Sequence, residues 1–159
     1  MNLIKKGLWL SIAFFMASLV MVPAFAYTCG IVTTSSGRLN IRQQSTTWSK
    51  VKSQAAKGSA LRILKTSGKW YKVKLNNGRV GYGLKDYIEK RYNGSCAIVA
   101  TKRTPLNIRR SARKGSRVIG QAAKGSAVAI WEWGRYWAKV MLNDGTWGFA
   151  NQRYLNIIE

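Results

Sequence analysis

One stretch of this chain occurs twice at a spacing of 67 residues, and this repeat constrains the fold more than any other feature of the sequence. The segments 54–60 and 121–127 are identical, and so are 39–42 and 106–109. About 26 of roughly 66 positions paired by this shift are identical without a gap, which indicates an internal duplication of one small domain. Two copies are too few for a solenoid. The sequence therefore predicts two similar domains.

Residues 1–26 have the layout of an export signal. Lys5 and Lys6 precede an apolar stretch that runs from Leu8 to Val22, and 23–26 supplies the small residues that a signal peptidase reads. We expect this signal helix to be cleaved before Tyr27, with the protein exported to the periplasm or the extracellular space and not stably inserted in a membrane. An uncleaved membrane anchor is the alternative, although the stretch is short for a span.

The two cysteines, Cys29 and Cys96, occupy equivalent positions in the two copies. An oxidising compartment favours a disulfide between them, which would tie the two domains together. Two buried free thiols are the alternative. With two thiols and no histidine in the chain, a metal site is not expected, and no cofactor is expected either.

The charge is strongly positive, because Lys and Arg outnumber Asp and Glu by 27 to 5. Both copies share the excess, so we expect an anionic partner. Nucleic acid is one such partner, but the export signal argues against it and favours anionic polymers of the cell envelope. Solubility alone is a further explanation for part of the charge.

The hydrophobic pattern after residue 26 is that of short strands. Tyr71, Val73 and Leu75 alternate with lysines, and 76–78 then predicts a hairpin with a two-residue turn, as does 143–145 in the second copy. Short strands broken by Gly and Asn, in units of about 60 residues, predict an all-β fold of two small barrels or sandwiches. Domains this small are marginal alone, so we expect them to touch.

The order of motifs in each copy resembles the bacterial SH3-like (SH3b) domain. The shared series is Leu-Asn-Ile-Arg, a polar loop, Lys-Gly-Ser, a hydrophobic strand, a Trp, the Asn-Gly hairpin, Gly-aromatic and a closing Tyr. The resemblance covers residues 27–91 as a first domain and 92–159 as a second. It implies two SH3-like barrels of five or so strands in tandem and, commonly, binding to peptidoglycan peptides. Both loops after the shared Arg lack the Gly-Pro that members often carry.

The residue inventory argues against catalysis. Without histidine, neither cysteine has an imidazole base to activate it as a nucleophile. A glycosidase needs two carboxylates across a cleft, but Asp86 and Glu89 become Arg153 and Asn156 in the other copy. We therefore expect a binding protein and not an enzyme.

Aromatic residues shared by the copies are the first candidates for ligand binding: Trp70, Trp137, Tyr82, Phe149, Tyr87 and Tyr154. Each is equally suited to packing in a core. The second copy adds Trp131, Trp133 and Trp147. Since Ile130 takes the inward phase, Trp131 and Trp133 are predicted to share the opposite face and form an aromatic platform beside Arg135. Packing between the domains explains these tryptophans as well.

Arg42 and Arg109 end the shared Leu-Asn-Ile-Arg segment. An arginine at the same place twice is suited to grip a carboxylate through two parallel hydrogen bonds. Hydrogen bonding to a loop carbonyl is the alternative. Asn40 and Asn107 are expected to satisfy local backbone groups.

The leading hypothesis is a secreted, non-catalytic protein whose tandem domains engage anionic cell-envelope material, with peptidoglycan first. The second is an exported adaptor that presents the tryptophans of the second copy to an acidic protein partner. The third is nucleic-acid binding, with which interleaved aromatic and basic residues are compatible.

Overall fold

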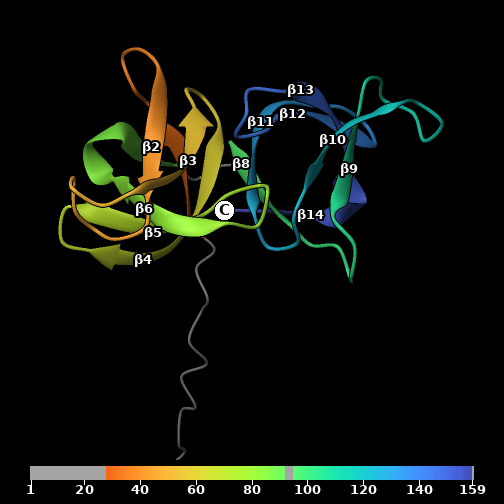
Figure 1. Ribbon diagram of the computed structural model, residues 1–159. Coiled ribbons are helices and arrows are strands. Elements are labelled where there is room, and N and C mark those ends of the chain that lie inside the picture. The colour runs from red at the N-terminus through yellow and green to blue at the C-terminus, as the bar shows by residue number, and fades with distance from the viewer. Residues whose placement is uncertain (1–27, 92–94, 159) are drawn as a thin grey trace, which may run out of the picture.

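The computed structural model describes residues 28–91 and 95–158, and these form two barrels side by side (Figure 1). The predicted signal at 1–26 lies outside the described residues. Within the described part no helix has the length and apolar character needed to cross a bilayer. The only helical turns there are two short 3₁₀ turns, so the all-β prediction is confirmed.

Each barrel is one antiparallel sheet of seven strands, where the resemblance implied five or so. The first sheet has the order β3-β2-β6-β5-β4-β1-β7 and the second β10-β9-β13-β12-β11-β8-β14, which is the same topology. The strands of the first are β1 (Thr28–Val32), β2 (Arg38–Arg42), β3 (Val51–Ala56), β4 (Ala60–Ser67), β5 (Trp70–Lys74), β6 (Val80–Leu84) and β7 (Ile88–Arg91), with η1 (Lys85–Tyr87) before β7. Those of the second are β8 (Cys96–Val99), β9 (Leu106–Arg109), β10 (Val118–Ala122), β11 (Ala127–Trp133), β12 (Trp137–Met141), β13 (Trp147–Asn151) and β14 (Leu155–Ile157), with η2 (Gln152–Tyr154) before β14.

The two barrel cores are built from the same positions. The first core contains Val32, Leu39, Ile41, Ala55, Leu61, Val73, Leu75 and Ile88. The residue 67 positions after each of these lies in the second core. Alternation along the strands therefore places one face of each sheet inside, as the sequence pattern predicted.

The hairpins between β5 and β6 and between β12 and β13 differ from the prediction. The N–H of Leu75 donates to Arg79 O, and the N–H of Gly78 donates to Leu75 O, so the loop contains three residues and not two. Gly78 has φ of 80° and its counterpart Gly145 has φ of 94°, which is the left-handed conformation that a three-residue hairpin loop requires at this position. The prediction of a two-residue turn was wrong, because the closing hydrogen bond joins Leu75 to Arg79 and leaves three residues between them.

A third apolar cluster joins the two barrels. It contains Cys29 and Ala60 from the first barrel and Cys96, Ile98, Ala127, Ala129, Met141 and Ile158 from the second. The two cysteines form a disulfide at its centre, with their Cα atoms 6.7 Å apart. The predicted contact between domains and the predicted cysteine pairing are both confirmed.

Hydrogen bonds across this contact occur in reciprocal pairs. The N–H of Ala56 donates to Asn143 O, and the N–H of Ala123 donates to Asn76 O, at 2.7 Å each. Asn76 Nδ2 donates to Ala127 O, and Asn143 Nδ2 donates to Ala60 O. The two bonds of each pair are related by the 67-residue shift, so exchanging the two domains turns one bond into the other. This is the arrangement of a two-fold symmetric dimer interface, here within one chain. The two barrels are therefore held in one relative orientation.

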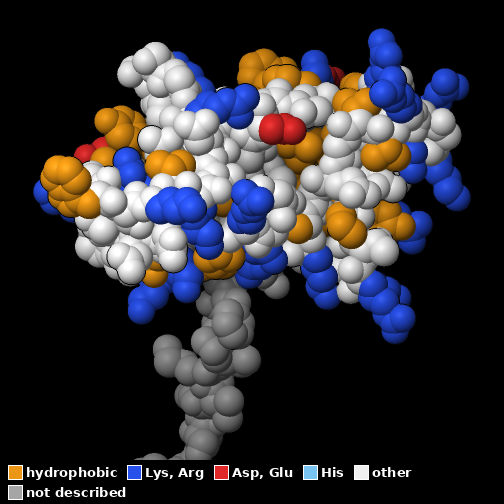
Figure 2. Space-filling model, in the orientation of Figure 1, with side chains coloured by type: hydrophobic (Ala, Val, Ile, Leu, Met, Phe, Trp, Pro, Cys, Tyr) orange, Lys and Arg blue, Asp and Glu red, His pale blue; other side chains and the backbone are white. Residues whose placement is uncertain are grey.

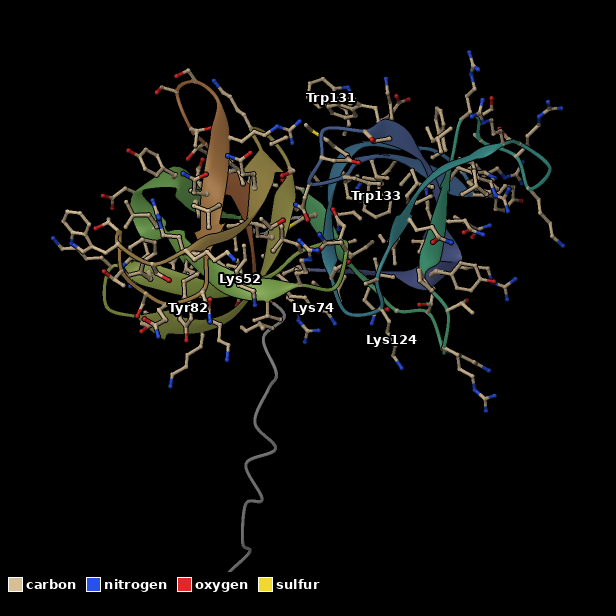
Figure 3. The ribbon with its side chains drawn as sticks, in the orientation of Figure 1. Lys52, Lys74, Tyr82, Lys124, Trp131 and Trp133 are labelled. Carbon is tan, nitrogen blue, oxygen red and sulfur yellow. A yellow bond between two sulfur atoms is a disulfide. The ribbon has the colours of Figure 1, made fainter. Side chains whose placement is uncertain are left out.

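Three basic side chains of the first domain, Arg38, Arg62 and Lys74, also donate hydrogen bonds to backbone carbonyls of the second, and Arg38 Nη2 does so to Asp144 O at 2.8 Å. Arg62 Nη1 donates to Gly125 O at 2.9 Å, and Lys74 Nζ donates to Lys124 O at 2.8 Å. Figure 3 shows Lys74 and Lys124 at the lower edge of the two barrels, where these loops meet. Hydrogen bonds from charged donors to backbone carbonyls further restrict movement between the domains.

Candidate functional site

The two domains carry the same pocket at equivalent positions. All eleven residues that line the pocket of the first domain have a counterpart, 67 positions later, that lines the pocket of the second. The first pocket has a volume of about 470 Å³ and the second of about 940 Å³. Equivalent positions therefore form a pocket in each domain, in addition to the equivalent positions that fill the two cores. We take this pair of pockets as the candidate binding site.

Four parts of the domain line each pocket. In the first domain they are the loop 34–36 after β1, the strand β2, Thr47 in the loop that follows β2, and a wall made by Trp70, Leu84 and Tyr87. Trp70 is buried, whereas Tyr87 is 43% exposed. A tryptophan as one wall and a tyrosine at the mouth give the pocket both apolar area and a polar tip. Trp137 and Tyr154 take the same places in the second domain.

Arg42 and Arg109 line these pockets while each holds the loop that follows it. Arg42 Nη1 donates to Ser49 O at 2.8 Å, and Arg109 Nη1 donates to Ser116 O at 2.6 Å. The alternative prediction, that these arginines hydrogen-bond to a loop carbonyl, is therefore met in both domains. One guanidinium nitrogen takes part in this bond, and a guanidinium has five N–H donors in all. The loop contact thus orients each arginine beside the pocket.

Asn40 and Asn107 do not satisfy local backbone groups, contrary to the prediction. Asn40 Oδ1 accepts from Gln54 Nε2 on the neighbouring strand, and Asn107 Oδ1 accepts from Gln121 Nε2, both at 2.9 Å. The two partners lie directly opposite in the register of β2 with β3 and of β9 with β10. These pairs stabilise the strands that form one side of each pocket.

The strand that carries Trp131 and Trp133 does not have the strict alternation from which the aromatic platform was predicted. The register of β11 with β12 shifts between Ile130 and Glu132, so Trp131 is the extra residue of a β-bulge and strict alternation ends there. Trp131 packs edge to face against Trp147, with ring centroids 5.3 Å apart and planes at 84°. Figure 3 shows Trp131 at the upper rim of the second barrel and Trp133 below it. Arg135 lies over the Tyr136 ring at 5.2 Å.

The remaining predicted site residues fall into two groups. Arg135, Trp137 and Phe149 line a third hollow of about 300 Å³ in the second domain. Tyr82 is half-buried opposite Arg42, as Phe149 is opposite Arg109. Gly81 and Gly148 precede these aromatics, and a Cβ at either would lie 2.7 or 2.8 Å from the carbonyl oxygen of the arginine. The Gly-aromatic motif thus permits the close strand crossing beside each pocket.

Sequence reasoning missed the loop and helical-turn residues that complete the pockets. Lys102, Arg103, Lys114 and Arg153 line the second pocket, where the first domain has Ser35, Ser36, Thr47 and Asp86 at the same positions. Aligning the two copies does show these four changes from neutral or acidic residues to basic ones. Without the fold, however, the four basic residues could not be told apart from the other Lys and Arg residues of this strongly basic chain.

Within the described part of the chain no group of three or more His, Cys, Asp or Glu side chains is placed to hold a metal ion. The one ion pair there joins Arg91 to Glu89, away from both pockets. What the pockets offer is aromatic surface, hydrogen-bond donors and positive charge. These features suit recognition of a ligand with apolar groups and anionic oxygens.

Comparison with known proteins identifies the domains. The model of the family described as "Bacterial SH3 domain" matches residues 37–89 and 104–156, so both copies are matched. No curated protein matches the chain. Two similar solved structures are NlpC2 from Trichomonas vaginalis (13% identity, TM-score 0.38) and an NlpC/P60 family protein from Bacillus cereus (11% identity, TM-score 0.36). The match covers 82% and 80% of this chain, which spans 47% and 55% of those chains.

Proposed function

Because the chain belongs to the bacterial SH3 domain family, we propose that it is an exported, non-catalytic protein whose two domains bind anionic cell-envelope material, with peptidoglycan peptides as the first candidate. The observation that carries this proposal is the pocket that both domains share, lined by Trp70 and Arg42 in one copy and by Trp137 and Arg109 in the other. The aromatic wall suits the apolar parts of a peptide or sugar, and the basic groups suit its carboxylates.

Two further observations support the proposal. One favours a non-catalytic role, and the other favours export. Both cysteines are used in a buried disulfide, and the chain has no histidine, so the usual nucleophile and base of a cysteine peptidase are lacking. A disulfide of this kind persists in oxidising compartments such as the periplasm or the extracellular space.

The fixed orientation of the two domains shapes how such a protein would bind a polymer. Two sites on one body raise the apparent affinity when a single polymer can occupy both. Since reciprocal hydrogen bonds and a disulfide hold the barrels together, the spacing of the two pockets does not vary with a flexible linker. The protein would therefore favour polymers that present ligands at a matching spacing.

Sedimentation with purified sacculi tests the proposal. We expect binding by the unmodified protein, weaker binding by Tyr87→Ala or Tyr154→Ala, and a much larger loss in the double variant because both sites are then affected. Both tyrosines are partly exposed at a pocket mouth, so the fold should tolerate the change. Trp48→Ala is the matched control, since Trp48 is 95% exposed and lines neither pocket. No sedimentation of the unmodified protein, even at low ionic strength, would refute the proposal.

A second candidate function is that of an exported adaptor for an acidic protein partner. It is favoured by Trp131, which is 71% exposed and rests on Trp147 with Lys139 6.0 Å from that ring. Aromatic residues, tryptophan among them, are enriched at protein interfaces relative to the rest of the surface. Replacing Trp131 and Trp133 by Ala should then abolish capture of the partner and leave sacculus binding unchanged. Loss of sacculus binding in that variant would contradict the adaptor role.

A further inference from the structure

The two equivalent pockets differ sharply in charge. Five cations line the second pocket, namely Lys102, Arg103, Arg109, Lys114 and Arg153, whereas Arg38 and Arg42 are the cations of the first. No Asp or Glu lines either of them. The two copies of the pocket thus differ in charge, and the pocket of the second domain is the strongly basic one.

General basicity of the second domain does not explain this difference. Residues 27–92 contain 14 Lys and Arg, of which two line the pocket, and residues 93–159 contain 11, of which five do. The domain with fewer cations therefore places more of them around one hollow. Figure 2 shows Lys and Arg side chains gathered at the end of the second domain that lies away from the first.

A polar group in the same pocket also lacks a partner. Thr101 lines the second pocket and is 7% exposed, and its hydroxyl is the one buried side-chain polar atom without a hydrogen bond among the described residues. Its counterpart in the first domain, Thr34, donates to Gly37 O at 3.2 Å. Position 104, which corresponds to Gly37, is a threonine. A buried hydroxyl without a hydrogen-bond partner costs free energy, so this position differs from its counterpart in polar satisfaction as well as in the charge around it.

The cations themselves are not neutralised by the protein. Lys102, Arg103, Lys114 and Arg153 are exposed, and the ion pair recorded in the described part of the chain involves none of them. Five positive charges around one hollow exceed what a single carboxylate, with one negative charge, would balance. A phosphate monoester carries up to two negative charges and a phosphodiester within a chain carries one, and both offer strong acceptor oxygens that arginine and lysine side chains recognise well. Consecutive phosphate groups of one chain would therefore balance several of these cations.

We propose that the pocket of the second domain is a binding site for phosphate groups of a polyanionic chain, and that the pocket of the first domain is not. This inference deepens the proposed function and rests on it for the cellular setting, because it assigns different ligand groups to the two pockets. The second domain would then select envelope polymers that carry phosphate, while the first would contribute contacts to less charged parts.

Calorimetric titration with tripolyphosphate tests the site directly. The test variant is K102S/R103S/K114T, which installs the residues of the first domain at the pocket of the second. The control variant is K50S/K65S/K69S, which removes the same charge from exposed positions of the first domain. At about 0.15 M salt we expect the test variant to bind tripolyphosphate about tenfold to hundredfold more weakly, and the control to change by about twofold or less.

Two results of this titration would overturn the proposal: no binding of tripolyphosphate by the unmodified protein, or equal losses in both variants, which would indicate the overall field. Stronger binding of hexaglutamate than of tripolyphosphate would also overturn it, since carboxylates would then be the preferred ligand.

Sacculi stripped of phosphate polymers and vesicles with anionic lipid distinguish the sources of the phosphate. Loss of binding on stripping supports a wall polymer, and binding to the vesicles supports lipid headgroups. Stripped sacculi also separate this inference from the proposed function. If they still bind through Tyr87 while tripolyphosphate does not bind, the phosphate site is wrong and the proposed function stands. If tripolyphosphate binds and no sacculi do, the phosphate site stands and the proposed function is wrong.

Discussion

Asn76 and Asn143 exchange hydrogen bonds across the two domains: the N–H of Asn76 donates to Asn143 Oδ1 at 2.7 Å, and the N–H of Asn143 donates to Asn76 Oδ1 at 2.8 Å. Both residues are 5% exposed, although they sit in hairpin loops. Their Nδ2 groups donate onward to the partner domain, to Ser126 and Ala127 from Asn76 and to Ser59 and Ala60 from Asn143. Each amide side chain therefore uses its donors and its acceptor in the interface.

Replacing either asparagine should destabilise the protein strongly. Asn76→Ala removes the acceptor for the N–H of Asn143 and the donor to Ala127 O, which leaves buried polar groups without partners. We expect a loss of about 2–4 kcal/mol in the free energy of unfolding, measured by urea denaturation. Asn77→Ala is the control, because Asn77 is exposed in the same loop and accepts a bond within it. Equal effects of the two substitutions would contradict a specific role for Asn76.

The disulfide should contribute about 4 kcal/mol to the free energy of unfolding, because it closes a loop of 67 residues in the unfolded chain. We expect a thiol reductant to lower the urea midpoint of the unmodified protein to that of Cys29→Ala/Cys96→Ala. The double variant itself should not respond to reductant. An unchanged midpoint after verified reduction of the bond would show that the apolar interface and its hydrogen bonds suffice.

The two equivalent threonines should respond in opposite directions to the same substitution. Thr101→Val removes a buried hydroxyl that has no partner and should raise the free energy of unfolding by about 1 kcal/mol. Thr34→Val removes a hydroxyl that donates to Gly37 O and should lower it by a similar amount. Thermal melts of both variants provide the measurement. A loss of stability in Thr101→Val without ligand would mean that the hydroxyl is satisfied.

The arginine-to-loop bonds should limit the motion of the loops beside the pockets. Arg109→Lys loses the fork that orients a donor toward Ser116 O, so amide exchange in 110–117 should become about five- to tenfold faster. Exchange in 43–50, held by Arg42, serves as the internal reference. Arg110→Lys, at an exposed position, is the control substitution. Unchanged exchange in 110–117 would show that other contacts hold the loop.

Much of the fold could be predicted from the sequence because its signals are local. The alternation of Tyr71, Val73 and Leu75 depends only on the two-residue period of a strand, and all three proved buried or half-buried. The repeat predicted two copies of one barrel, and equivalent positions fill both cores. The strand count and the hairpin loop were less accurate, since both depend on which backbone groups pair.

The candidate site was less accessible to sequence reasoning. Arg42, Arg109, Trp70 and Trp137 were among the predicted residues and line the paired pockets. The platform of Trp131, Trp133 and Arg135 stays a prediction, but a β-bulge at Trp131 breaks the strict alternation on which it was based. A bulge depends on the pairing of β11 with β12, which no local pattern encodes.

The sequence by itself determined the duplication, the strand pattern, the apolar core positions and the positive charge, since each follows from residue type and spacing along the chain. The tertiary structure decided what those residues do between elements. It turned Asn76 and Asn143 from turn residues into the centre of an interface, paired Cys29 with Cys96, and gathered five of the second domain's cations around one hollow. The physical reason is that these relationships depend on how the two barrels and their loops are oriented in space.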